Sequence, residues 1–293
     1  MKNYRALRFL VLIPIVLAFI TTIAVAQPSS PADNSCGEVI TLETHDRTTS
    51  RYTLARAQRR AAQETPMALV LLVGGGGHLD LDDQGCPRQL TGNSLVRMLS
   101  LFHDAGFITA LVDAPSDHFG EEGLAGFRVA PQHAMDIGKI IADVRARTKT
   151  SVWLIGTSRG TISAVNAASQ LSGPSAPDGI VLTSALMVGD KGARKTWVAH
   201  TVFDLPLEKI KTPILVIGHA ADNCLRSPAI LMGNVTARTQ GIREQVVTVT
   251  GGPIAVGRVP SLEVCAGRQP HGFVDQEAEV AAGIARFIRG EKY

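Results

Sequence analysis

The chain has 293 residues, of which 45% are hydrophobic, so it is long and apolar enough to form one domain with a large buried core. It has 29 basic and 26 acidic residues, and three of the basic ones (Lys2, Arg5 and Arg8) precede residue 27 without any acidic partner. The remainder is therefore neutral, which excludes the basic surface that a nucleic-acid-binding protein needs.

The first 26 residues have the composition of a secretory signal peptide. A basic start is followed by an apolar run from Phe9 to Ala26 that ends in Ala-Val-Ala, a small-x-small cleavage sequence. A retained membrane anchor is the alternative, because the run is almost long enough to cross a bilayer. We expect a signal peptide over 1–26, a flexible leader over 27–36 and a single exported domain, periplasmic or secreted, over 37–293.

Predicted strands and helices alternate along the rest of the chain. An opening hairpin is expected over 37–43 and 51–57, and further strands over 67–73, 107–112, 151–155, 179–186, 212–218 and 246–250. Helices are predicted over 91–105, 131–148, the segment after Ser158, 227–240 and 276–289. Because several strands are apolar throughout, the pattern predicts an α/β fold with a mainly parallel sheet covered on both faces. The active sites of such sheets lie at the carboxyl ends of the strands.

The pentapeptide Gly156-Thr157-Ser158-Arg159-Gly160 lies between a predicted strand and a predicted helix. Its Gly-x-Ser-x-Gly spacing is that of a nucleophile elbow, a strained turn that exposes a serine hydroxyl above the sheet. Glycine at both flanking positions avoids clashes with the neighbouring strand and helix. Because the motif arises by chance in about one chain of this length in ten, it needs partners elsewhere in the sequence.

A serine nucleophile needs a histidine that takes its proton and a carboxylate that orients the histidine. In folds with this elbow, both follow the serine along the chain. The candidate histidines after Ser158 are His200, His219 and His271. We predict His271 as the base, because it lies in a loop between the last strand and the last helix. His219 is expected to line the pocket.

The predicted carboxylate is Asp222, which follows the strand ending at Gly218. Its alternative role is to cap the next helical segment. Asp190 and Asp204 follow no strong strand, and Asp178 leads into a strand, which places it at the opposite edge of the sheet.

A run of four glycines followed by His78 comes directly after the strand at 67–73. The negative oxygen of an acyl-transfer intermediate needs two or three N–H donors, and glycine lets the backbone approach it closely. We expect one donor from Arg159 and the others from this loop, with Gly76 and Gly77 preferred over Gly75 and His78. A phosphate-binding loop is the alternative, but neither phosphate-binding glycine motif is present.

Taken together, Val73–His78, Gly156–Gly160, Asp222 and His271-Gly272-Phe273 resemble the α/β-hydrolase superfamily over roughly residues 37–290. The His-Gly-Phe sequence is similar to that of dienelactone-hydrolase-like and peptidase-like members. The resemblance implies the α/β-hydrolase fold and a Ser158–His271–Asp222 triad without a cofactor. The glycine loop of this chain differs from the His-Gly-Gly-Gly order of lipases and esterases, since His78 follows the glycines. The eight histidines form no His-x-His or His-x-x-x-His pair, so we expect no metal centre.

Four cysteines in an exported chain indicate two disulfides with three possible pairings. In the fold that the resemblance implies, the acid loop and the histidine loop adjoin. We therefore expect a Cys224–Cys265 bridge between them, which leaves Cys36 to pair with Cys86.

The connection over 188–209 is too short for a large lid, which disfavours an interfacial lipase. We expect an exported serine hydrolase that cleaves a small-molecule carboxylic ester, with no nucleic-acid partner and no membrane partner after signal cleavage. A peptidase, amidase or thioesterase with the same residues, and a non-catalytic binding protein, are the alternatives. The residues expected to shape the pocket are Leu79, Asp80, Asp117, His118, Phe119, Leu186, Met187, Trp197 and Phe273.

Overall fold

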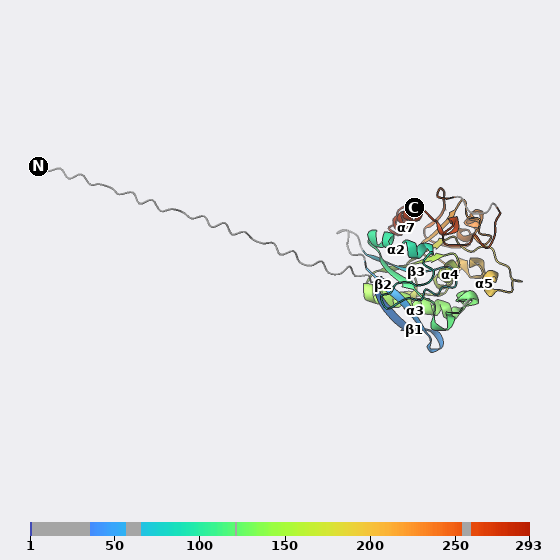
Figure 1. Cartoon of the computed structure of the whole chain (residues 1–293), viewed down its shortest axis with the longest axis horizontal. Helices are drawn as coiled ribbons and strands as arrows, with labels where there is room; N and C mark the ends of the chain where they lie inside the picture. The colour runs from blue at the N-terminus through green and yellow to red at the C-terminus, as the bar shows by residue number, and fades with distance from the viewer. Residues whose placement is uncertain (2–35, 57–65, 121, 254–258) are drawn as a thin grey trace. The chain divides into compact units, whose positions relative to one another are not determined.

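The computed structural model describes Met1 and residues 36–56, 66–120, 122–253 and 259–293 (Figure 1). The predicted signal peptide and leader lie, apart from Met1 and Cys36, outside the described residues. Residues 36–293 form the unit described below. In the described part of the chain there is no helix capable of spanning a bilayer.

One eight-stranded sheet organises this unit, in the order β1-β2-β4-β3-β5-β6-β7-β8. Strands β3 to β8 are parallel, whereas β2 runs antiparallel to both β1 and β4. The strands are β1 (Glu38–Glu43), β2 (Thr49–Ala55), β3 (Met67–Leu72), β4 (Ile108–Val112), β5 (Ser151–Thr157), β6 (Gly179–Thr183), β7 (Ile214–His219) and β8 (Glu244–Val249). The predicted mainly parallel sheet is confirmed.

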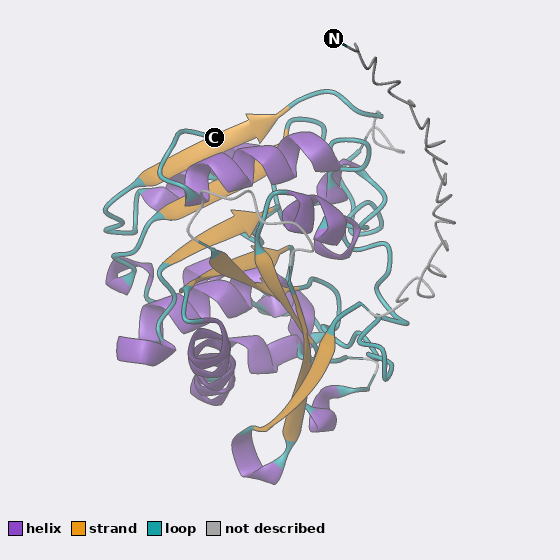
Figure 2. Cartoon of the chain, turned by 90° about the vertical axis from the view of Figure 1, so that its left-hand side faces the viewer, coloured by secondary structure: helices purple, strands orange, loops and turns teal. Residues whose placement is uncertain are grey.

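Helices cover both faces of the sheet (Figure 2). They are α1 (Ser94–Arg97), α2 (Leu99–Asp104), α3 (Pro131–Thr148), α4 (Gly160–Gln170), α5 (Thr196–Ala199), α6 (Gly233–Thr236) and α7 (Glu277–Ile288). Short 3₁₀ turns are η1 (His45–Arg47), η2 (Ser116–His118), η3 (Ala125–Val129), η4 (Gly173–Ser175), η5 (Val202–Asp204), η6 (Leu207–Lys209), η7 (Ala229–Leu231) and η8 (Pro270–Gly272).

Two hydrophobic layers follow from the alternation of side chains along each strand. In β3, Val70 packs with α3 and α4, whereas Leu69 and Leu71 pack with α1, α2 and α7. Both sets are fully buried, which explains why β3 is apolar throughout. From Glu244 to Thr248 the edge strand β8 alternates between exposed and half-buried residues, because one of its faces meets solvent, and its last residue, Val249, is buried.

Two predicted helices are shorter than expected. The segment over 91–105 is divided into α1 and α2 at Met98, whose ψ of −2° interrupts the helix. The segment over 227–240 contains only η7 and α6, and Pro228 is the N-cap of η7. The connection from β6 to β7 is described throughout and contains only α5, η5 and η6, so it forms no large lid.

The hydrophobic layer between α3 and the sheet gives a stability prediction that compares a buried isoleucine with an exposed one. Ile141→Ala, at a fully buried position, should lower the free energy of unfolding by about 2–5 kcal/mol because it leaves a cavity. Ile230→Ala is the control, since Ile230 is 90% exposed and the same substitution there should change stability by less than about 0.5 kcal/mol. Denaturant unfolding of both variants measures the difference, and equal effects would contradict the layer assignment.

Candidate active site

Ser158 occupies the sharp turn between β5 and α4. Its φ of 51° lies in the left-handed region, and its N–H donates to the carbonyl of Thr183 at 2.9 Å. A Cβ on Gly160 would lie 2.0 Å from the Leu72 carbonyl oxygen, and one on Gly156 would lie 2.5 Å from the Gly160 oxygen. The close approach of three backbone segments therefore requires both glycines of the motif.

Three distant segments bring Ser158, His271 and Asp222 into contact. His271 lies in η8, between β8 and α7, and its Nε2 is 2.9 Å from Ser158 Oγ. Its Nδ1 is 3.0 Å from Oδ2 of Asp222, in the loop after β7. Both side chains are almost fully buried. With Nδ1–H donating to the carboxylate, Nε2 is left to accept the hydroxyl proton of Ser158.

Two further serines contact the same histidine. The Ser227 hydroxyl donates to Oδ2 of Asp222 at 2.8 Å and lies 3.0 Å from His271 Nδ1. The Ser184 hydroxyl donates to the backbone carbonyl of His271 at 2.7 Å. Both side chains are buried, so they fix the ring and the backbone of His271. Sequence reasoning missed both, although Ser184 directly follows the apolar strand β6.

The two predicted disulfides are present. Cys224–Cys265 joins the loop of Asp222 to the segment that leads to His271, and Cys36–Cys86 joins the start of β1 to the loop beyond the glycine run. Backbone hydrogen bonds support the first bridge, because Leu225 N–H donates to the Ser261 carbonyl and Ser261 N–H donates to the Asn223 carbonyl. The acid loop and the histidine loop are thus connected both covalently and by hydrogen bonds.

The carbonyl groups of the glycine loop are held from one side. Arg128, buried under this loop, donates to the carbonyls of Val73 and Gly75 at 3.1 and 3.3 Å, and Leu124 N–H donates to that of Gly76. In a trans peptide the next N–H points the opposite way, so the N–H groups of Gly74, Gly76 and Gly77 point away from Arg128 and Leu124. Burial of the guanidinium is the main cause that lowers the pKa of Arg128 to about 9, and the positive charge of the nearby Arg159 lowers it further.

A cavity of about 340 Å³ lies beside Ser158 and His271. Its other lining residues come from the glycine loop, the start of α1 and the segment before η8: Gly74, Gly75, Leu90, Gly92, Asn93, Ser94, Thr157, Cys265, Ala266, Gly267 and Gly272. None of the nine residues expected to shape the pocket is in this set. Leu79 and Phe273 belong to the hydrophobic core, and Asp117 and His118 contact His45 instead.

The oxyanion donors stay a prediction. A Cβ added to Gly76 would lie 3.6 Å from the Cα of Gly123, and Gly77 packs against Leu124, so both glycines face the segment at 123–124. In contrast, Gly74 and Gly75 line the cavity. His78 does not line it either, because its Nδ1 is 3.1 Å from the buried carboxylate of Asp113. That carboxylate also accepts the N–H groups of Leu79 and Leu81 and so fixes the end of the glycine loop.

The other histidines and carboxylates considered from the sequence make structural contacts away from Ser158. His219 Nδ1 accepts from Ala221 N–H, and its Nε2 donates to the Gly251 carbonyl, so this ring braces its loop and does not line the cavity. Asp204 caps η5, and Asp190 accepts the N–H of Gly192. Asp178 binds the Val152 N–H and Arg145 at the opposite end of the sheet. His200 lies 3.8 Å from Asp204.

No protein-family model matches the chain, and a comparison with curated proteins finds no match. Solved structures do match. The chain is similar to a carboxyl esterase from Bacillus coagulans, at 14% identity over 86% of this chain and 98% of that one, with a TM-score of 0.57. It is also similar to a dienelactone hydrolase from Anabaena variabilis, at 13% identity over 87% and 97%, with a TM-score of 0.56.

A third match is the esterase Est2 of Thermogutta terrifontis with propionate bound, at 17% identity over 88% of this chain and 96% of that one, with a TM-score of 0.53. These matches span nearly the whole of each neighbour and show that this chain has the α/β-hydrolase fold. At such low identities they show the fold alone.

The crowding at the elbow gives a prediction that does not depend on activity. Gly160→Ala should destabilise the protein by about 1–3 kcal/mol or more, because the new methyl group meets the backbone of β3. Gly233→Ala, at the first residue of α6, meets nothing within 4 Å and should leave stability unchanged or raise it by up to about 1 kcal/mol. Thermal unfolding compares the two, and a stable Gly160→Ala variant would contradict the described turn.

Proposed function

We propose that this protein is an exported serine hydrolase that cleaves a carboxylic ester through an acyl-enzyme intermediate. The observation that carries the proposal is the continuous path of contacts from Ser158 Oγ through His271 to Asp222. A serine held in the left-handed elbow, with an imidazole on its hydroxyl and a buried carboxylate behind that imidazole, is equipped for nucleophilic attack on a carbonyl carbon.

In the proposed reaction, Ser158 Oγ attacks the ester carbonyl while its proton passes to His271 Nε2. The carboxylate of Asp222 stabilises the imidazolium that forms. Backbone N–H groups of Arg159 and the glycine loop hold the negative oxygen of the tetrahedral intermediate. His271 then protonates the departing alcohol. A water molecule, deprotonated by the same imidazole, attacks the acyl-enzyme and releases the acid and free Ser158.

The cavity supports a substrate of modest size. Its volume of about 340 Å³ is at the lower end of small-molecule sites, and Leu90 is the one large aliphatic side chain among the described residues that line it. Est2 of Thermogutta terrifontis, which shares the fold, has been solved with propionate and with butyrate bound. We therefore assign short acyl groups to this site.

A peptidase, amidase or thioesterase would use the same catalytic residues, and comparing matched ester, amide and thioester substrates separates these activities.

The two disulfides add a structural argument that supports the proposed export. Both bridges form in an oxidising compartment, which agrees with export through the N-terminal signal sequence. Mass determination of the protein recovered from the periplasm or medium tests this part of the proposal, with cleavage after Ala26 as the expected result.

Removal of the nucleophile tests the proposal directly. Ser158→Ala should lower kcat for p-nitrophenyl acetate and butyrate by roughly 10⁴-fold or more, because no other group can form the acyl-enzyme. A fluorophosphonate probe should label the unmodified protein and not this variant. Ser100→Ala, at an exposed position of α2, is the matched control and should keep full activity and labelling. Undiminished turnover by Ser158→Ala would refute the catalytic assignment, and an unlabelled, inactive native protein would favour a non-catalytic binding protein.

The two disulfides allow a matched comparison of stability and positioning. Their cysteines are 50 and 41 positions apart in the sequence, so removing either bridge should lower the free energy of unfolding by a similar amount, about 2–4 kcal/mol. Only Cys224→Ala/Cys265→Ala should also lower kcat of the folded protein, by between ~10- and 100-fold, because it releases the loops of Asp222 and His271. Cys36→Ala/Cys86→Ala should keep kcat. Equal kcat values for both variants well below their melting temperatures would show that the first bridge has no positioning role.

A further inference from the structure

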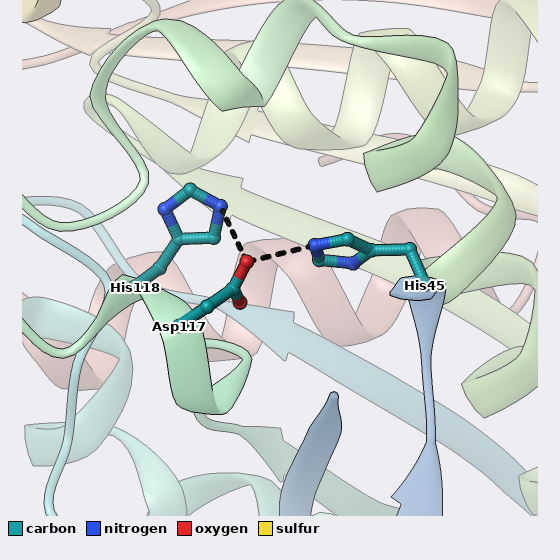
Figure 3. Close-up of side chains that lie close together, drawn as sticks. All are labelled: His45, Asp117 and His118. Atoms are coloured by element: carbon teal, nitrogen blue, oxygen red, sulfur yellow. Dashed lines mark hydrogen bonds and ion pairs between the residues drawn. The ribbon is translucent and has the colours of Figure 1, made fainter. Parts of the chain in front are cut away.

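His45, Asp117 and His118 form a cluster of metal-ligating side chains outside the triad (Figure 3). His45 lies in η1, the turn between β1 and β2, and the other two residues lie in η2, after β4. Figure 3 shows Asp117 between the two imidazole rings, with one carboxylate oxygen facing a nitrogen of each. No sequence motif indicates this cluster, because His45 and Asp117 are 72 positions apart.

We propose that these three residues bind a divalent transition-metal ion of the zinc type. Oδ2 of Asp117 lies 3.0 Å from His45 Nε2 and 3.7 Å from His118 Nε2, and the ligand atoms of all three lie within 4.8 Å of one another. Neighbouring ligand atoms in a tetrahedral zinc site are about 3.3–3.4 Å apart, as follows from Zn–N and Zn–O bonds of roughly 2.0–2.2 Å. The two distances from Asp117 lie on either side of that value and the two histidine nitrogens lie within 4.8 Å of each other, so side-chain rotations can bring the three atoms to the spacing of the ion.

Second contacts orient both imidazoles for this role. His45 Nδ1 is 2.6 Å from the buried carboxylate of Asp136, and His118 Nδ1 is 3.3 Å from the carbonyl of Gly123. When Nδ1–H donates to these oxygens, the lone pair of each Nε2 is available to a metal, which is the usual arrangement around metal-binding histidines. The ring of Phe127 packs against both imidazoles, at centroid distances of 4.6 and 4.3 Å, and limits their rotation.

The ligand set selects the class of ion. Two imidazoles and one carboxylate are ligands for zinc, cobalt or nickel, whereas Mg²⁺ and Ca²⁺ prefer sites made of oxygen atoms. The Asp117 side chain is 41% exposed, so water can occupy the remaining coordination position. Among the described residues, the other close group of potential ligands is Asp222, Cys224 and His271, but its cysteine is in a disulfide.

A bound ion would join the β1–β2 turn to the segment that supports the glycine loop. His118 contacts the carbonyl of Gly123, and an added Cβ on Gly123 would lie 2.2 Å from the Gly76 carbonyl oxygen, so the two backbones are in direct contact. The N–H of Leu124 donates to that same oxygen. We therefore assign the ion a stabilising role that extends to the loop beside Ser158. This assignment rests on contacts and holds whether or not the proposed hydrolase activity is found.

Metal binding by the full chain, purified and stripped with EDTA, is the test. Isothermal titration with Zn²⁺ should give one ion per chain and raise Tm. Titration with Co²⁺ should give the visible absorption of a tetrahedral site with nitrogen and oxygen ligands. His118→Gln and Asp117→Asn, both at partly exposed positions, should each weaken Zn²⁺ binding by at least about 100-fold, and Asp136→Asn by about 10- to 100-fold.

Two controls separate this site from other binding. His200→Gln, at a half-exposed histidine outside the cluster, should leave Zn²⁺ affinity unchanged. His271→Gln should also leave it unchanged, which excludes binding at the proposed triad. Circular dichroism checks that each variant is folded. Absence of Zn²⁺ binding by the unmodified protein would overturn the proposal and leave the cluster as an ion pair of His45 with its carboxylates. Binding that survives in both His118→Gln and Asp117→Asn would overturn it as well.

Discussion

The close approach of β3, β5 and the start of α4 is the constraint on which the site depends. A side chain at Gly160 would collide with the backbone at Leu72, and Ser158 follows β5 in the left-handed conformation. Such a conformation is strained for a serine and persists because the surrounding sheet and helix fix the backbone on both sides. The same crowding directs the hydroxyl toward the carboxyl edge of the sheet, where the loops of Asp222 and His271 end.

Much of this arrangement follows from the sequence, because parallel strands place their carboxyl ends at one edge. The elbow, Asp222 and His271 each follow a strand, so their order along the chain predicts the positions that the contacts then reveal. The pairing of Cys224 with Cys265 follows from the same adjacency. A continuous apolar run is sufficient to predict strands such as β3, which are buried on both faces.

Other features carry no signal that sequence reasoning can use. Ser227 and Ser184 are ordinary residues until the fold brings their hydroxyls to His271. The residues expected to shape the pocket do not line the cavity beside Ser158: Asp117 and His118 turn toward His45, and Leu79, Leu186, Met187 and Phe273 lie in the hydrophobic core. The lining comes instead from the segment before α1 and the segment before η8. Loop paths depend on long-range contacts, such as those of Arg128, that neither composition nor spacing encodes.

The burial of Arg128 behind the glycine loop has an electronic consequence. A guanidinium that donates to the carbonyls of Val73 and Gly75 draws electron density toward those oxygens, and the peptide resonance transmits this polarisation to the amide hydrogens of Gly74 and Gly76. Those hydrogens become more positive beside the cavity that Gly74 lines. A buried cation on one side of the loop thereby increases the acidity of the backbone amides on the opposite face.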